Sequence, residues 1–370
     1  MNKPTRQLHD LGQRLWLDNI NRALLRSGTL QRYISEFSIT GLTSNPTIFE
    51  QAFGAGDYDD SIRVLDAAGL AGEALFFELA LEDLTQAADL FRPIWDASDG
   101  ADGWVSLEVS PLLADNTAHT IQAANKLFER AAKANLFIKI PGTPEGVRAV
   151  EEVIFDGVPV NVTLLFSREH YLAAAEAYMR GIERRLEAGL DPKVASVASL
   201  FVSRWDVAVK QEISLPFHNR LGIAMAMRTY RAYRDLLASD RWQKLAAAGA
   251  RPQRLLWAST GTKDPAAPDT LYVQALAAAD TINTLPEKTL LAFADHGRIG
   301  SAMPADGGYA DAVLEEFRRE GVDDNALAQR LQREGVEAFA MSWHAMLSRI
   351  REKCVPPPVS AGPASGHDAT

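Results

Sequence analysis

The chain has 370 residues, of which 47% are hydrophobic and 23% are charged, a composition that excludes a wholly disordered or fibrous protein. A net charge of −10 argues against a dedicated nucleic-acid surface, because phosphate backbones are bound by basic stripes. The single cysteine, Cys354, excludes an intrachain disulfide, and neither a signal-peptide pattern nor a long apolar span is present, so we expect a cytoplasmic protein without a membrane segment.

Short apolar runs predict eight strands separated by stretches with helical periodicity. The strands are expected at Arg14–Asn19, Ile39–Asn45, Trp104–Ser110, Leu136–Ile140, Val158–Leu165, Val194–Val202, Leu255–Thr260 and Thr281–Leu285. The helical stretch 167–188 shows the pattern well, with Ser167 as N-cap and Gly189 just beyond its end. Because no glycine-rich phosphate fingerprint follows the first strand, this alternation favours a closed (β/α)8 TIM barrel over an open doubly wound sheet.

Two long connections, 47–103 and 203–254, have room for additional helices packed outside the barrel. Further helices are expected after the last strand at 310–320, 324–334 and 336–350, clamped onto the outside of the domain. Residues 1–354 are therefore expected to form a single TIM-barrel catalytic domain. From Val355 onward proline, glycine and alanine dominate, which predicts a disordered tail over 355–370.

Alternation along the strands separates apolar faces from polar ones. The apolar faces should meet the helices, which sends Glu108 of the third strand and Lys139 of the fourth into the barrel. The same pattern directs further polar residues inward, namely Asp18, Thr43, Asn45, Asn161 and Thr163, and directs Leu164 outward with Val158, Val160 and Val162. Since active sites of such barrels lie at the C-terminal ends of the strands, these polar residues are expected to converge in one pocket.

The chemistry of that pocket would centre on Lys139. Burial in an apolar strand disfavours the ammonium form of a lysine, and a neutral amine can attack a ketone to form a Schiff base. Two structural alternatives remain open at this point: Glu108 and Lys139 can form a purely structural ion pair, and Asp18 can cap the following helix. Neither explains why polar residues recur at similar depths in several strands.

An ordered series of motifs gives the chain a specific likeness. They are Leu15-Trp16-Leu17-Asp18, Gly41-Leu42-Thr43-Ser44-Asn45-Pro46-Thr47, Val105-Ser106-Leu107-Glu108-Val109, Ile138-Lys139-Ile140-Pro141, Asn161-Val162-Thr163-Leu164-Leu165-Phe166-Ser167 and the segment 199–204. On these motifs the sequence resembles the transaldolases, in their longer bacterial subfamily, from about Leu15 to about Gly297, with matching helices beyond.

The resemblance implies a metal-free and cofactor-free transfer of a dihydroxyacetone unit from sedoheptulose 7-phosphate to glyceraldehyde 3-phosphate, in the pentose phosphate pathway. By the family's motifs, Lys139 is the Schiff-base lysine and Glu108 the acid/base that moves protons through a water held by Thr163. Asp18 is the base that drives cleavage of the carbon–carbon bond. The likeness assigns substrate binding to Asn45, Asn161, Ser199, Arg204 and Ser259, and to Lys263, which replaces an arginine of the better-known pattern as a point charge.

Other conspicuous residues receive ordinary structural interpretations. We interpret His170 and Tyr178 as solvated or packing residues of a surface-exposed helix. The run Arg228, Arg231 and Arg234 has near-helical spacing, which indicates one charged face of an amphipathic helix.

Two alternative functions remain. An aldolase of the fructose-6-phosphate type would use the same lysine but release free dihydroxyacetone, and a non-catalytic barrel would only bind sugar phosphates. Sugar phosphates are the expected partners in every case, with no nucleic acid or membrane partner. The pattern leaves the oligomeric state open between a monomer and a homodimer.

Overall fold

The computed structural model describes residues 3–354, so the prediction of a disordered tail over 355–370 lies outside the described residues. Eight parallel strands pair in chain order, and the last closes onto the first. The strands are β1 (Arg14–Asp18), β2 (Ile39–Thr43), β3 (Trp104–Glu108), β4 (Leu136–Pro141), β5 (Val160–Leu165), β6 (Ser196–Phe201), β7 (Arg254–Ala258) and β8 (Ile282–Leu285). Helices join successive strands, which confirms the predicted (β/α)8 barrel.

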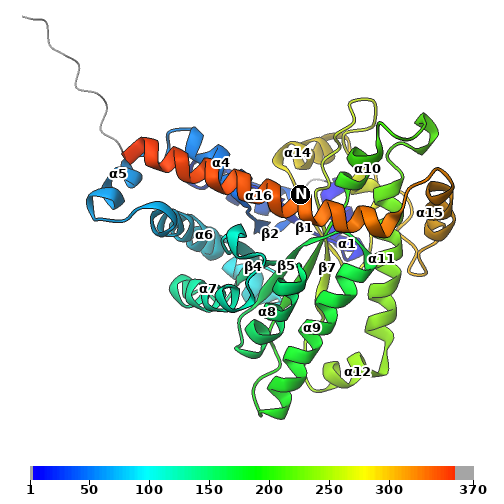
Figure 1. Cartoon of the computed structure of the whole chain (residues 1–370), viewed down its shortest axis with the longest axis horizontal. Coiled ribbons are helices and arrows are strands. Elements are labelled where there is room, and N and C mark those ends of the chain that lie inside the picture. The colour runs from blue at the N-terminus through cyan, green and yellow to red at the C-terminus, as the bar shows by residue number, and fades with distance from the viewer. Residues whose placement is uncertain (1–2, 355–370) are drawn as a thin grey trace, which may run out of the picture.

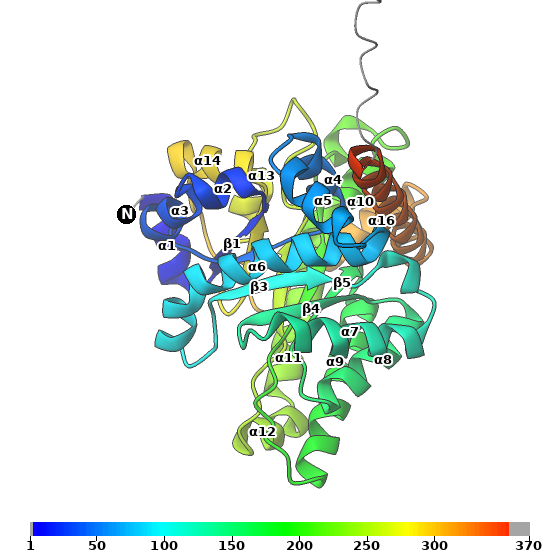
Figure 2. The same ribbon diagram turned by 90° about the vertical axis from the view of Figure 1, so that its left-hand side faces the viewer.

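The helices lie around the barrel and over its ends (Figures 1 and 2). They are α1 (Lys3–Leu11), α2 (Arg22–Arg26), α3 (Thr29–Phe37), α4 (Pro46–Gly54), α5 (Asp59–Ala67), α6 (Gly72–Ala97), α7 (Thr117–Ala131), α8 (Pro144–Phe155), α9 (Arg168–Glu187), α10 (Ser203–Val209), α11 (Leu221–Ala238), α12 (Asp240–Ala247), α13 (Leu271–Ala275), α14 (Glu287–His296), α15 (Ala310–Arg319) and α16 (Asp324–Cys354), with 3-10 turns at Pro111–Leu113 and Leu215–Phe217. Both long connections hold several helices, as predicted.

Large side chains fill the N-terminal half of the barrel interior. The rings of Trp104 and Phe137 stack with their centroids 4.1 Å apart, and Trp16 packs against Phe137. Gly41 of β2 makes room for Trp16, because a β-carbon at Gly41 would lie 2.6 Å from that indole ring. This packed half leaves the C-terminal half of the interior for polar side chains.

The C-terminal helix differs from the prediction in length and in position. The two segments expected at 324–334 and 336–350 form one continuous helix, α16, which crosses over the strands instead of clamping onto the outside (Figure 1). Gln332 donates hydrogen bonds from Nε2 to the backbone carbonyls of Gly142, 2.9 Å away, and Leu164, 3.0 Å away. Gly335 lets the helix approach, since a β-carbon there would lie 3.0 Å from Cδ2 of Leu164. The helix is thus fixed onto the C-terminal end of the barrel.

The predicted outward orientation of Leu164 is wrong. Its φ of +57° is left-handed, and the register between β5 and β6 shifts between Val162 and Leu165. This irregularity breaks the period of two, so Leu164 packs with Phe166 and Phe339 rather than with the outer helices. The local strain, of order 1–3 kcal/mol, accompanies the turn of β5 toward α16.

Two interpretations of charged and aromatic helix residues also need correction. Tyr178 is buried, and its hydroxyl donates to the carbonyls of Val194 and Arg251, so α9 is not surface-exposed on this side. Arg228 is buried against α16, where Nη1 lies 2.8 Å from Asp324. The three arginines do have helical spacing, but Arg228 is buried by its ion pair with α16 and so does not belong to an exposed charged face. Within residues 3–354, no helix is both long and apolar enough to cross a membrane.

Candidate active site

Lys139 and Glu108 form a buried pair at the C-terminal end of the barrel. They occupy paired positions on β4 and β3, and Nζ of Lys139 lies 3.3 Å from Oε2 of Glu108. Nζ also donates to the carbonyl of Ser44, 3.0 Å away. Burial raises the pKa of Glu108, although the nearby Lys139 lowers it in part. Glu108 is therefore a carboxyl group able to hold a proton beside an amine.

Asp18 ends β1 and lies on the same side of the barrel. Its Oδ1 accepts a hydrogen bond of 2.7 Å from the hydroxyl of Thr43 on β2. Burial raises the pKa of Asp18, and the positive charges of Lys139 and Lys263 oppose that shift. The helix-cap alternative is not realised, because Asn21 caps α2 instead.

A cavity of about 350 Å³ opens above these residues. It is lined by most of the residues predicted from the sequence, namely Asp18, Asn45, Lys139, Thr163, Ser199, Arg204, Ser259 and Lys263. The two other predicted residues, Glu108 and Asn161, lie behind this lining. Side chains from β1, β4, β5 and β6, from the starts of α4 and α10 and from the loop after β7 therefore converge on one volume of sugar-phosphate size.

Thr163 and Glu108 have oxygen atoms available to reacting groups. Oγ1 of Thr163 and both carboxylate oxygens of Glu108 are buried, and within residues 3–354 no side chain or backbone group hydrogen-bonds to them. Buried oxygens normally have such partners. Oε2 of Glu108 lies 3.3 Å from Nζ of Lys139, and Thr163 lines the cavity beside this pair, which suits proton transfer at the lysine.

Asn45 reaches the cavity because it also starts a helix. Its Oδ1 accepts from the backbone N–H of Ile48, and Pro46 occupies the first position of α4. This cap fixes the side-chain amide of Asn45 at the edge of the cavity that it lines. The same signature, asparagine followed by proline, is visible in the sequence.

Asn161 and Ser199 are joined across β5 and β6. Oγ of Ser199 donates to Oδ1 of Asn161 over 2.7 Å, and Nδ2 of Asn161 donates to the hydroxyl of Ser106. Asn161 is 0% exposed, whereas Ser199 lines the cavity. The structure therefore brings Asn161 into the site as a support for Ser199 and not as part of the cavity wall.

Arg204 follows β6 and lies between two aromatic rings. Its guanidinium carbon is 5.0 Å from the ring centroid of Phe201 and 5.8 Å from that of Phe339. Burial lowers the pKa of Arg204, and Glu108 raises it in part. In the described part of the chain, no ion pair engages this guanidinium, so its donors can serve an anion.

The loop after β7 brings Ser259 and Lys263 to the cavity beside the start of α10. Ser259 adopts a left-handed φ of +55°, and its hydroxyl lies 2.9 Å from that of Ser203. Lys263 is exposed and lines the cavity close to Gly261. Arg204, from the first turn of α10, and Lys263, from the loop after β7, thus line one polar cavity.

Several lining residues were missed by the sequence reasoning. Phe201 stands two positions after Ser199 on the same face of β6, so the period of two could have found it. Thr284 of β8 could have been found in the same way, and its hydroxyl lies 2.6 Å from that of Thr43. Phe339 could not, because only the course of α16 brings its ring to 5.9 Å from Nζ of Lys139.

The comparisons with known proteins agree with this geometry. The sequence model of the family described as "Transaldolase/Fructose-6-phosphate aldolase" matches residues 15–350, which is nearly the whole chain. The chain belongs to the transaldolase/fructose-6-phosphate aldolase family. The match confirms the resemblance inferred from the motifs, including the helices beyond Gly297, and ends within α16.

Curated members of this family are similar over their full length. The protein named transaldolase in Thermobifida fusca is 43% identical over 363 residues, which cover 95% of this chain and 99% of the relative. Those of Parafrankia sp. and Thiobacillus denitrificans are each 44% identical, covering 95% and 94% of this chain and 98% and 99% of the relatives. Such coverage means that the barrel and its C-terminal helix are shared as a unit.

Proposed function

We propose that this chain is a transaldolase, transferring a dihydroxyacetone unit from sedoheptulose 7-phosphate to glyceraldehyde 3-phosphate and giving erythrose 4-phosphate and fructose 6-phosphate. The observation that carries the proposal is the buried Lys139–Glu108 pair, with nitrogen and oxygen 3.3 Å apart, at a cavity within this family's barrel. The curated relatives named transaldolase support the transfer activity.

Imine formation begins at Lys139. Its proton passes to Glu108, and the neutral amine attacks the ketone carbon. A C–N bond forms, the π bond of the carbonyl breaks, and a proton moves from the nitrogen to the oxygen, which becomes the hydroxyl of the carbinolamine. Glu108 then returns a proton through a water that Thr163 helps to hold, and the hydroxyl leaves as water. Because burial raises the pKa of Glu108, this carboxyl can carry the proton between the two steps.

Asp18 acts as the base in cleavage of the carbon–carbon bond. It takes the proton of the hydroxyl next to the breaking bond, and the electron pair of that bond moves toward the iminium nitrogen. The products are an aldose phosphate and an enamine that stays on Lys139 until an acceptor aldehyde arrives. The addition then runs in reverse, with Asp18 returning the proton.

The remaining residues hold the substrate. Asn45 and Ser199 bind hydroxyls of the three-carbon unit, and Asn161 orients Ser199. Arg204 binds phosphate through its planar fork, and Ser259 and Lys263 of the loop after β7 add a hydroxyl and a second positive charge. The ring of Phe339 covers Lys139, which keeps bulk water from the enamine. We place this activity in the cytoplasm.

The alternative activity of this family is release of free dihydroxyacetone. A coupled assay with fructose 6-phosphate, with and without erythrose 4-phosphate, distinguishes the two. Sustained turnover only with the acceptor supports transaldolase. Equal turnover without it would establish the aldolase, and binding without turnover in either arm would establish the non-catalytic barrel.

A further inference from the structure

A second and larger cavity lies at the N-terminal end of the barrel, away from Lys139. It encloses about 700 Å³ between α1, the end of α6 and the first residues of β1 and β7. Figure 2 shows α1 and α16 on opposite sides of the barrel. Arg14 and Asp18 begin and end β1, so about 13 Å of strand separates this cavity from the candidate active site.

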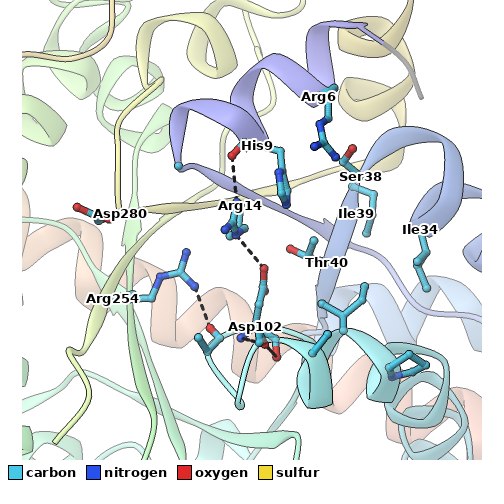
Figure 3. A pocket seen from close by; sticks show the side chains of 16 residues that line it. Arg6, His9, Arg14, Ile34, Ser38, Ile39, Thr40, Asp102, Arg254 and Asp280 are labelled. Carbon is cyan, nitrogen blue, oxygen red and sulfur yellow. Dashed lines mark hydrogen bonds and ion pairs between the residues drawn. The ribbon is translucent and has the colours of Figure 1, made fainter. Parts of the chain in front are cut away.

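Two arginines project into this cavity from strand ends (Figure 3). Arg14 lies with Nε 3.2 Å from Asp102 and donates from Nη1 to the carbonyl of His9. Arg254 donates from Nη1 to the carbonyl of Ala101 and from Nη2 to that of Thr281. Both guanidinium groups are therefore held in place by the protein.

The positive charge of Arg254 is not balanced by an ion pair. Asp102 accepts from Trp16 and the backbone N–H of Gly103 through Oδ1, and its Oδ2 faces Arg14. Asp280, the other acid of the lining, lies 2.6 Å from Arg234. Within residues 3–354, no carboxylate comes within ion-pair distance of Arg254. Arg254 is half-buried, and a guanidinium with no carboxylate close by keeps N–H donors for an anion.

His9 lies on the wall beside these arginines (Figure 3). Burial lowers its pKa, and the charges of Arg14 and Arg6 lower it further, against the opposing effects of Asp102 and Asp10. The imidazole therefore senses the charges of these arginines and can report on an anion bound beside them.

The opposite wall of the cavity is apolar. Ile34, Ile39, Pro93 and Ile94 line it, and Ala97 and Ser98 close its edge. A bare phosphate would leave these side chains uncovered. A ligand with both an anionic group and an apolar body would satisfy both walls.

We propose that this N-terminal cavity binds a small organic phosphate, with the phosphate against Arg254 and Arg14 and an apolar or aromatic body against the isoleucines. The arginine forks match phosphate geometry, and the size suits a ring-containing metabolite. The site is independent of the function proposed above, because no residue of the active-site cavity lines it.

The test follows the ring signals of His9 by NMR, assigned with a His9→Gln variant, during titration with phenyl phosphate or inorganic phosphate. Phosphate bound at the distant Arg204 does not touch this reporter. We expect a saturable shift with phenyl phosphate at millimolar concentrations, and binding roughly tenfold weaker for inorganic phosphate, which lacks the apolar body. Absence of a saturable shift would overturn the proposal, and equal affinities would overturn the assigned ligand class.

Two variants probe the site by different means. Arg254→Met removes the unbalanced charge, and we expect phenyl phosphate to bind about tenfold to a hundredfold more weakly. Ala97→Trp, at an exposed position of α6, fills the cavity without altering an arginine and should abolish the shift even if Arg254→Met folds poorly. Arg251→Met is the matched control, since Arg251 pairs with Asp99 outside this cavity. Wild-type affinity in Ala97→Trp would contradict the assignment.

Discussion

Replacing Gln332 by leucine should loosen α16 at the point where it crosses the barrel. The side chain is buried, and its one amide nitrogen donates to two carbonyls, those of Gly142 and Leu164. Leucine preserves most of the volume but leaves both carbonyls without this donor. Buried groups that lose a partner cost about 1–3 kcal/mol each, so we expect the free energy of unfolding to fall by about 2–4 kcal/mol.

The substitution should lower the activity of the protein as well as its stability. Phe339 stands two helical turns beyond Gln332 and covers Lys139, so displacement of α16 moves this ring. For a chain of this size a loss of 2–4 kcal/mol lowers the melting temperature by about 3–5 °C. We expect kcat/KM at 25 °C, well below melting, to fall by about tenfold or more.

Calorimetry and steady-state kinetics measure the two effects separately. Gln329→Leu, an exposed glutamine on the same helix, is the matched control and should change neither quantity. An unchanged melting temperature in Gln332→Leu would refute the hydrogen-bond argument. A lower melting temperature with unchanged kcat/KM would show that α16 stabilises the barrel without covering the site.

Three further predictions concern single groups. Glu108→Gln should slow imine formation by about 10²–10⁴-fold, whereas Asp18→Asn should form the imine at nearly the wild-type rate and fail in cleavage. Rapid-quench trapping measures the two steps separately. Equal rates of imine formation in Glu108→Gln and wild type would contradict the separate roles given to Glu108 and Asp18. Lys263→Met should raise KM for sugar phosphates several-fold with little change in kcat, and an unchanged KM would remove Lys263 from the phosphate site. Burial raises the pKa of Asp206 from 3.8 to about 6, so its stabilising contribution is present below about pH 4 and is lost as the pH rises through about 6. Denaturant unfolding should therefore show wild type losing about 3 kcal/mol relative to Asp206→Asn across that range, and a constant difference would contradict the raised pKa.

The sequence was sufficient for the barrel and for its polar interior. The period of two in β3 and β4 correctly predicted that Glu108 and Lys139 point into the barrel. The apolar face of each strand packs against the helices, so the polar face can only point inward. The same rule failed at Leu164, where a left-handed residue interrupts the strand, and no residue type in that segment signals the interruption.

Long-range features could not be predicted from local patterns. The course of α16 depends on Gln332 meeting carbonyls about 170 and 190 residues earlier, and the burial of Arg228 depends on Asp324. Periodicity describes which face of an element is apolar but not which distant element covers it. For the same reason, the sequence did not predict that Phe339 lines the site.

The central claim is that Lys139 forms the Schiff base, and borohydride reduction in the presence of fructose 6-phosphate tests it most directly. Peptide mass spectrometry should find a three-carbon adduct on Lys139 in the wild-type protein. Lys139→Ala should show no adduct and no turnover while its circular dichroism spectrum is unchanged. An adduct on another lysine, or turnover by Lys139→Ala at the wild-type rate, would contradict the account.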